Sequence, residues 1–294
     1  MVVALADGRT ELSYLQIVLE VERLTMNLDG RRIGLLLPNG CAWAVLDLVT
    51  QRSGSVCMPM PSFFSDGQLR HLIADAGPQL IFTDQPMRLQ RLVEVTQSTE
   101  IRVAGSRFFC CEIPPAATLP LSPDISKITY TSGTTGRPKG AMITHYAAVR
   151  AGWEYSLGVR ASSKDIFIGF LPMSHSYGCG SILIQPLLLQ STVVLMEKFE
   201  VEKAFQLIQR EKITLQLGAP PHYIMELNHS SRPDYDLSSI RAGLIAGMIA
   251  PEGLVSRVEK EMGVYLTSFW GASEVGPGLG TMCRYTSPLD IREK

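Results

Sequence analysis

The clearest chemical signal in this chain is a loop rich in glycine and hydroxyl groups at residues 130–140, which read Tyr-Thr-Ser-Gly-Thr-Thr-Gly-Arg-Pro-Lys-Gly. After its first residue it contains three glycines, four hydroxyl side chains and one lysine. Backbone N–H groups, hydroxyls and an ammonium group in such a loop can surround phosphate oxygens. It is not a Walker A loop, because Lys139 is followed by Gly140 instead of Ser or Thr. An ordinary surface turn has a similar composition, so composition alone leaves both interpretations open.

Two further loops carry polar or aromatic side chains directly after apolar runs. Residues 172–178 read Pro-Met-Ser-His-Ser-Tyr-Gly, and residues 270–274 read Trp-Gly-Ala-Ser-Glu. In parallel α/β sheets, ligands bind beyond the carboxyl ends of the strands. All three loops are therefore candidates for ligand binding.

Strands and helices alternate along the chain, which is typical of parallel βαβ units. The predicted strands are 33–37, 56–60, 80–83, 101–104, 127–130, 165–171, 192–196, 214–217, 242–246 and 265–269. The predicted helices are 13–28, 41–52, 66–76, 86–96, 145–155 after an N-cap at Thr144, 200–212, and one opened by Pro251. Residues 114–126 contain four prolines within ten positions and predict a linker between a first lobe at 1–113 and a phosphate-loop lobe at 127–294.

Composition describes an ordinary globular protein. A chain of 294 residues allows one large or two ordinary domains, and 46% of its residues are hydrophobic against 19% charged. The net charge of −1 gives no electrostatic reason to expect binding to nucleic acid or to an anionic membrane. The most apolar stretch, 179–189, is shorter than the roughly 20 residues of a membrane span, so we expect a buried helix there.

The N-terminus and the cysteines indicate a cytoplasmic protein. Charged residues follow Met1 within the first dozen positions, so no signal peptide is expected. The six cysteines form no CxxC pair and are expected to be reduced thiols, mostly in the core. The histidines outside the loops, at 71, 145, 222 and 229, lack the spacing of metal ligands and are expected to be structural or exposed.

Together these loops resemble the signature motifs of the adenylate-forming superfamily of acyl- and aryl-CoA ligases, luciferases and peptide-synthetase adenylation domains. Residues 131–140 match the superfamily's phosphate-binding signature at every defined position. Residues 171–175 (Leu-Pro-Met-Ser-His) resemble its second motif, and 270–274 its aromatic-Gly-x-Thr-Glu motif. Weaker similarities at 54–59 and 218–220 occur in the same order, so the resemblance covers nearly the whole chain.

The resemblance implies a fold and a reaction. The expected fold class is α/β: the N-terminal domain of the adenylate-forming fold, with two parallel-type βαβ lobes and with the barrel-like part and the C-terminal lid domain incomplete or missing. The implied reaction is that of an AMP-forming acid–CoA ligase. A carboxylate attacks the α-phosphorus of ATP, in the presence of Mg²⁺, to give an acyl-adenylate and pyrophosphate. CoA then displaces AMP to give a thioester.

The same resemblance assigns roles to individual residues. Lys139, His175 and Glu274 would be catalytic, and Glu274 would bind Mg²⁺, which prefers carboxylate oxygen. Trp270 would stack on adenine, and Ser273 would place a hydroxyl near the α-phosphate. The implied acyl-pocket residues are His175, Tyr177, Ala219 and Met248. The implied ATP- or AMP-binding residues are Thr131, Ser132, Gly133, Thr134, Thr135, Gly136, Lys139, Gly247, Met248, Trp270, Gly271, Ala272 and Ser273.

The sequence departs from the superfamily pattern in two ways. Residues 245–248 (Ile-Ala-Gly-Met) stand where a Ser-Gly-Gly-Ala-like turn is usual, and the larger Ala246 and Met248 could narrow the acyl tunnel or shift the adenine edge. The chain also ends at Lys294 without the Thr-Gly-Asp motif, the hinge or the lid lysine of the superfamily. We therefore expect an N-terminal fragment with little or no turnover by itself.

Two other functions stay open at this point. An adenylation domain that loads the phosphopantetheine arm of a carrier protein would show the same motifs. A non-catalytic nucleotide-binding module could keep the loops without the reaction. A dinucleotide-binding oxidoreductase is disfavoured, because no GxGxxG stands between a strand and a helix. The substrate acid, aliphatic or aromatic, and the oligomeric state are not defined by these residues.

Overall fold

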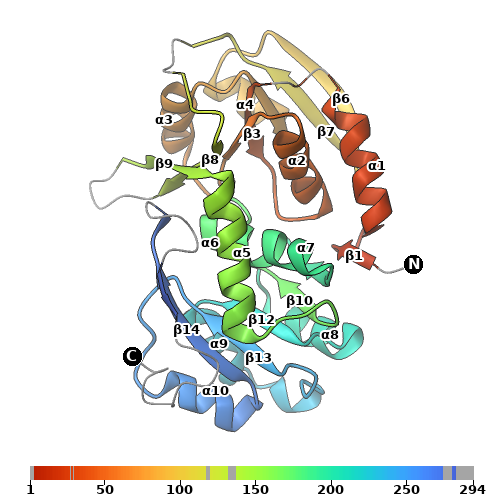
Figure 1. Ribbon diagram of the computed structural model, residues 1–294, viewed down its shortest axis with the longest axis vertical. Coiled ribbons are helices and arrows are strands. Elements are labelled where there is room, and N and C mark those ends of the chain that lie inside the picture. Colours follow the sequence, from red (N-terminus) through yellow and green to blue (C-terminus); the bar gives the residue numbers. More distant parts are fainter. Residues whose placement is uncertain are drawn as a thin grey trace.

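The computed structural model describes residues 3–26, 28, 30–116, 120–131, 137–273 and 280–282. Within these ranges, two sheets are stacked with helices between them and on both outer sides (Figure 1). We call them the upper sheet and the lower sheet, after their places in Figure 1. The order of layers is therefore helices, sheet, helices, sheet, helices. This arrangement positions the three motif loops.

The upper sheet has seven strands among the described residues. In spatial order they are β6 (Gln97–Val103), β7 (Ser106–Glu112), β5 (Leu80–Thr83), β3 (Arg32–Leu36), β4 (Val56–Pro59), β8 (Ile125–Thr131) and β9 (Lys139–Thr144). The central strands β5, β3, β4 and β8 are parallel, whereas the β6–β7 and β8–β9 hairpins at the two edges are antiparallel.

The lower sheet has eight strands among the described residues. In spatial order they are β15 (Gly280–Met282), β14 (Tyr265–Gly271), β13 (Ala242–Ile245), β12 (Leu215–Gly218), β10 (Ile166–Gly169), β11 (Thr192–Leu195), β1 (Val3–Ala6) and β2 (Glu11–Ser13). The strands from β14 to β1 are parallel to one another. Because β10, β12, β13 and β14 are parallel, their carboxyl ends lie at the same edge of this sheet. Ligands of α/β proteins bind at this edge.

Helices cover both sheets. The outer face of the upper sheet carries α3 (Asp66–Ala76) and α4 (Pro86–Leu92). The middle layer contains α2 (Cys41–Arg52), with α1 (Tyr14–Thr25) packed on it, α5 (His145–Val159), α6 (Ser176–Cys179), the π-helical turn η1 (Gly180–Ile184) and α7 (Gln185–Leu189). The outer face of the lower sheet carries α8 (Val201–Glu211), α9 (Pro220–Leu227) and α10 (Leu254–Met262), and a short 3₁₀ turn, η2 (Arg232–Asp234), follows α9.

One hydrophobic core joins the two sheets. It includes Leu35 of β3, Trp43 of α2, Tyr155 of α5 and Phe167 of β10, all buried. A second, smaller cluster fills the space between the upper sheet and α3 and α4. The middle layer is thus packed on both sides, and the two sheets form one body.

Most predicted elements are present with boundaries shifted by a few residues. The helices at 41–52 and 66–76 and the strand at 80–83 coincide with α2, α3 and β5. The predicted N-cap is also confirmed, because the Thr144 side chain accepts a hydrogen bond from the Ala147 amide at 3.1 Å. The helix that follows is longer than predicted and runs to Val159.

The upper sheet corrects several expectations. The glycine-rich loop joins two strands of a hairpin, not a strand and a helix, because residues 139–144 form β9. The sheet is mixed, not purely parallel, and β7 was not predicted. The helix predicted at 86–96 ends at Leu92, since the chain enters β6 at Gln97. The helix predicted to open at Pro251 is α10, on the outer face of the lower sheet, and it begins three residues later at Leu254.

The predicted linker at residues 114–126 does not separate the strands of one sheet from those of the other. Strands β8 and β9 follow this segment, yet they complete the upper sheet built by strands that precede it. Strands β1 and β2 come from the start of the chain, yet they pair into the lower sheet. The chain therefore crosses between the sheets more than once.

Two expectations from composition can be compared with the described residues. None of the described helices combines the length and apolar character needed to cross a membrane. Five of the six cysteines are described, and they are free thiols. Four of these five are buried, as expected; Cys110 is half-buried.

A buried polar pair joins β12 to α9. The Gln216 side-chain amide donates a hydrogen bond to a Glu226 carboxylate oxygen at 2.6 Å, and both side chains are buried. Burial raises the pKa of Glu226 to about 8, from an ordinary value of 4.5. The folded protein therefore holds this carboxyl in its neutral form over a pH range in which the unfolded chain ionises it.

This difference predicts a pH dependence of stability. As the pH rises from 4.5 towards 8, the unfolded state loses a proton that the folded state keeps, so the free energy of unfolding falls. The contribution of this group falls by at most about 1.4 kcal/mol per pH unit. We expect Glu226→Gln to be increasingly more stable than the wild type between pH 5.5 and 8, as measured by urea unfolding. The same substitution at the exposed Glu252 is the control; parallel pH profiles for wild type and Glu226→Gln would contradict the prediction.

Candidate nucleotide site

The glycine-rich loop connects the two strands of the β8–β9 hairpin. Thr131 and Lys139 are paired across the two strands, so residues 132–138 connect them. Thr131 is half-buried, while Arg137 and Lys139 are exposed. Five of the predicted phosphate-binding residues lie outside the described residues, namely Ser132, Gly133, Thr134, Thr135 and Gly136.

Helix α3 anchors this loop through two hydrogen bonds that the sequence did not reveal. The His71 Nε2–H donates to the Pro138 carbonyl oxygen at 3.0 Å. The Tyr130 hydroxyl donates to the Asp75 carboxylate at 2.6 Å. His71 is therefore structural, as expected, but its role is to fix one end of the candidate phosphate loop.

The loop after β10 is clamped by a residue of the upper half. The Asn39 amide nitrogen donates to the Leu171 carbonyl at 2.8 Å, and the Asn39 side-chain oxygen accepts from the Met173 amide at 2.8 Å. The loop also needs a glycine at 178, because a Cβ there would lie 2.0 Å from the Pro172 carbonyl oxygen. The sequence suggested only a turn for the Pro-Asn-Gly segment that contains Asn39.

His175 begins helix α6 as its N-cap. The His175 Nδ1 accepts a hydrogen bond from the Tyr177 amide at 3.2 Å, so the ring hydrogen lies on Nε2. The side chain is exposed at the edge of the lower sheet. His175 is therefore fixed by its own helix at the predicted ligand-binding edge.

Tyr177 has a supporting position. Its ring is buried, and its hydroxyl lies within hydrogen-bond distance of the carbonyl oxygens of Gly218 (3.2 Å) and Leu244 (3.3 Å). Burial raises the pKa of Tyr177 well above its ordinary value, so the hydroxyl keeps its proton. The residue thus ties the second motif loop to the ends of β12 and β13.

The third motif loop meets the second through two hydroxyls. The Ser273 Oγ lies 2.5 Å from the Ser176 Oγ, and both side chains are buried. Trp270 is 66% exposed on β14, where it pairs with Thr281 of β15. Figure 1 shows β14 extending beyond its neighbours in the direction of the β8–β9 hairpin. Ser176 was not predicted, because nothing in the sequence relates it to a residue 97 positions away.

The ends of β12 and β13 complete this edge. The Ala246 amide donates to the Gly218 carbonyl at 3.1 Å. Gly247 has a φ of +90°, which favours glycine, and a Cβ there would lie 3.9 Å from that of Ala219. Met248 is 59% exposed beside them. Ala219 and Met248, predicted for the acyl pocket, are therefore neighbours of Gly247, which was predicted to bind the nucleotide.

The described residues contain no group of three His, Cys, Asp or Glu side chains able to hold a metal ion. A Mg²⁺ ion bound mainly by nucleotide phosphates, water and one carboxylate needs no such group. The buried hydroxyl of Ser273 at the end of β14 fits a site of that kind, because it adds a neutral oxygen ligand or donor without a competing charge. Glu274, the expected metal ligand, lies outside the described residues.

Comparison with known proteins agrees with this geometry. A model of the AMP-binding enzyme family matches residues 2–294. The chain therefore belongs to the AMP-binding enzyme family.

Individual relatives narrow the class. The chain is 28% identical to a feruloyl-CoA synthase of Amycolatopsis over 94% of its own length and 57% of the relative's. It is also 28% identical to 4-coumarate-CoA ligase 1 of Narcissus pseudonarcissus over 95% of its own length and 55% of the relative's. The chain thus spans somewhat more than half the length of these acid–CoA ligases.

Solved structures show the same fold. ATP-bound MatB from Rhodopseudomonas palustris superimposes with a TM-score of 0.81 at 21% identity, over 98% of this chain and 59% of that one. The N-terminal domain of FACL13 from Mycobacterium tuberculosis superimposes with a TM-score of 0.81 at 19% identity, over 99% of this chain and 77% of that one. The chain therefore has the predicted α/β fold of the N-terminal domain of adenylate-forming enzymes.

Proposed function

We propose that the complete protein is an AMP-forming acid–CoA ligase. The observation that carries this proposal is the contact between Ser176 and Ser273, which joins the second and third motif loops at the ligand-binding edge of the lower sheet. Membership of the AMP-binding enzyme family supports it. So do the acid–CoA ligases among the relatives.

The first half-reaction brings two anions together, so the site must supply positive charge and hydrogen-bond donors. The carboxylate oxygen forms a bond to the α-phosphorus of ATP, and the bond to pyrophosphate breaks. We assign the phosphate contacts to Lys139, Thr131 and the loop between them. Mg²⁺, held by Glu274 and phosphate oxygens, would offset the charge of the leaving pyrophosphate.

The edge of the lower sheet would hold the adenylate. The exposed face of Trp270 suits stacking on adenine, and Gly271, Ala272, Ser273 and Gly247 would line the nucleotide. The Nε2–H of His175 would donate to the reacting carboxyl group. Ala219 and Met248 would form the wall of the acyl pocket, with the Tyr177 hydroxyl bonded to the carbonyl oxygens of the nearby Gly218 and Leu244.

In the second half-reaction, a thiolate attacks the carbonyl carbon of the acyl-adenylate and AMP leaves. Relatives of this chain are CoA ligases of aromatic and long-chain fatty acids, which favours CoA as that thiol and an aliphatic or aromatic acid as the substrate. A carrier-protein phosphopantetheine offers the same thiol chemistry. Thioester formation with free CoA but not with a carrier protein would establish the proposed acceptor, and the reverse result would replace it.

A screen tests the proposed function. A panel of aliphatic and aromatic acids is incubated with the complete protein, ATP, Mg²⁺ and CoA, and release of pyrophosphate and AMP is measured. We expect release that depends on one class of acid. Tight nucleotide binding with no acid-dependent release would instead identify a non-catalytic nucleotide-binding module.

The anchor between α3 and the glycine-rich loop gives a separate prediction. His71→Ala removes the hydrogen bond to the Pro138 carbonyl, so the loop must be ordered when nucleotide binds. We expect the KM for ATP to rise by about 3- to 10-fold, as for the loss of one hydrogen bond, with a smaller change in kcat. His229→Ala, at a distant half-buried histidine, is the control; an unchanged KM for ATP in His71→Ala would show that this anchor does not act on the nucleotide.

A further inference from the structure

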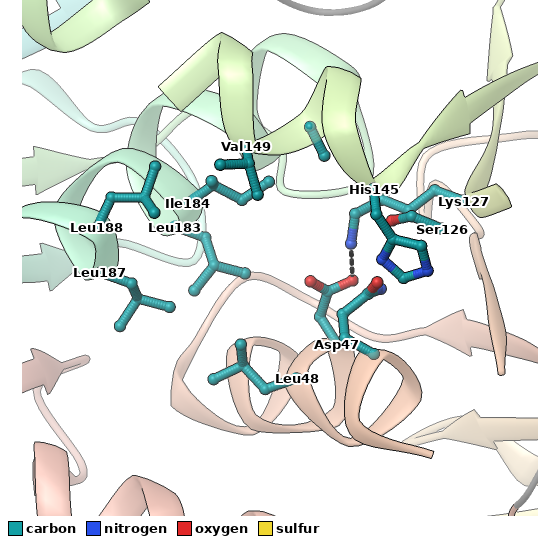
Figure 2. Close-up of a pocket in the computed structure, with 12 residues that line it drawn as sticks. Asp47, Leu48, Ser126, Lys127, His145, Val149, Leu183, Ile184, Leu187 and Leu188 are labelled. Atoms are coloured by element: carbon teal, nitrogen blue, oxygen red, sulfur yellow. Dashed lines mark hydrogen bonds and ion pairs between the residues drawn. The ribbon is translucent and has the colours of Figure 1, made fainter. Parts of the chain in front are cut away.

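A cavity of about 300 Å³ lies in the middle layer, between α2, α5 and the η1–α7 segment (Figure 2). Its lining includes Ser126 and Lys127 at the start of β8, whereas the glycine-rich loop begins after Thr131 at the other end of that strand. Five residues of extended strand separate Ser126 from Thr131 by roughly 16 Å. The cavity is therefore distinct from the candidate nucleotide site.

One side of the cavity is aliphatic. Leu48 of α2, Val149 of α5 and three leucines at 183, 187 and 188 face the same space in Figure 2. Val149 is 44% exposed at its opening. Apolar surface that faces a cavity open to solvent gains free energy when an apolar ligand covers it, at about 25 cal/mol per Å².

The other side is polar and lies at the first turn of α5. His145 is the first residue of this 15-residue helix, and Ser126 is buried next to it. The buried Ser126 and the half-buried His145 both line the cavity. A serine hydroxyl and an imidazole at a cavity wall can form hydrogen bonds with a ligand that enters the cavity.

The charges around this polar end favour an anionic head group. The neighbouring Lys127 and Asp47 form a buried ion pair, so together they carry no net charge. The imidazole of His145, the Ser126 hydroxyl and the N-terminus of α5 can each donate a hydrogen bond or attract negative charge. Among the residues that line the cavity, Asp47 is the carboxylate, and it is paired with Lys127, so the donors at this end suit a carboxylate ligand.

The volume limits the length of the ligand. A water molecule occupies about 30 Å³ in the liquid, so 300 Å³ accommodates roughly ten heavy atoms. We propose that this cavity binds a medium-chain aliphatic carboxylate, with its carboxylate at Ser126 and His145 and its chain along Leu48, Val149 and Leu187. Octanoate, with eight carbons and two oxygens, is the matching probe.

Calorimetric titration of the complete protein with octanoate and with octan-1-ol tests the proposal. We expect saturable octanoate binding that is at least tenfold tighter than octanol binding. Val149→Trp, which fills the opening from a half-exposed helix position, should weaken octanoate binding at least tenfold. Leu157→Trp, on the same helix at a 68% exposed position outside the cavity lining, should leave the binding unchanged.

Two further variants identify the head-group end and the site. His145→Ala should weaken octanoate binding about tenfold and octanol binding much less, because only the carboxylate uses the imidazole. Met248→Trp, at the candidate acyl pocket, should not affect this binding. Octanoate binding that Met248→Trp abolishes and Val149→Trp spares belongs to the acyl pocket and overturns the proposal. Absence of saturable binding below 10 mM, or equal affinities for acid and alcohol, overturns it as well.

Discussion

Replacing Lys139 with alanine is expected to lower acid-dependent ATP–pyrophosphate exchange by about 100- to 1,000-fold. Lys139 is exposed at the first position of β9, directly after the glycine-rich loop, and its backbone is fixed by pairing with Thr131. Its ammonium group can therefore reach phosphate oxygens without being needed in the core. A decrease of this size in the exchange rate is expected when one charged group that stabilises the transition state of nucleotidyl transfer is removed.

The free energy of unfolding should change by less than about 0.5 kcal/mol in Lys139→Ala, because an exposed side chain is removed. Lys164→Ala, at another exposed lysine of the same chain, controls for the loss of one surface charge. Unfolding and exchange are measured on both variants and on the wild type. An exchange rate in Lys139→Ala within threefold of the wild type would remove this residue from the proposed phosphate site.

Replacing Lys127 with methionine is expected to cost about 3–5 kcal/mol of folding free energy. Lys127 of β8 and Asp47 of α2 are both almost fully buried and form an ion pair. Burial opposes the charged form of Lys127, but the charge and hydrogen bond of Asp47, together with the neighbouring Cys179 and Cys57, outweigh burial and raise the lysine pKa. Removal of the lysine leaves the Asp47 carboxylate in the core without its cationic partner, and this unpaired buried charge causes the large loss of folding free energy.

The double variant Asp47→Leu/Lys127→Met is the matched control for this prediction. It removes both charges and replaces them with apolar side chains of similar size, so it should recover most of the stability lost in Lys127→Met. Chemical unfolding of the wild type, both single variants and the double variant gives the coupling energy. If the double variant is as unstable as the sum of the single variants, the pair contributes nothing through its interaction.

The sequence could predict features that a few neighbouring residues determine. Thr144 was identified as an N-cap because the cap and the amide that it binds are three residues apart. The helices α2 and α3 follow from local periodicity and from their flanking turn residues. The three motif loops were also found from short runs of residues, each placed after a predicted strand.

Features that depend on distant residues escaped prediction. Asn39 binds Leu171 and Met173 from more than 130 positions away, and its own neighbours indicate only a turn. His71 acts on Pro138 in the same way, 67 positions apart. Strand β9 was missed because its Lys-Gly-Ala-Met-Ile-Thr sequence has a weak apolar alternation and gains its place by pairing with β8.

The central claim is that a carboxylate attacks the α-phosphorus of ATP in this protein. The most direct test uses the accepted acid labelled with ¹⁸O in its carboxylate, together with ATP, Mg²⁺ and CoA, and follows the label by mass spectrometry of the products. The proposed reaction transfers one ¹⁸O atom to AMP, because that oxygen forms the bond to phosphorus and stays with AMP when the thiol attacks. Formation of ADP with ¹⁸O in inorganic phosphate, or of AMP without label, would contradict the proposed acyl-adenylate.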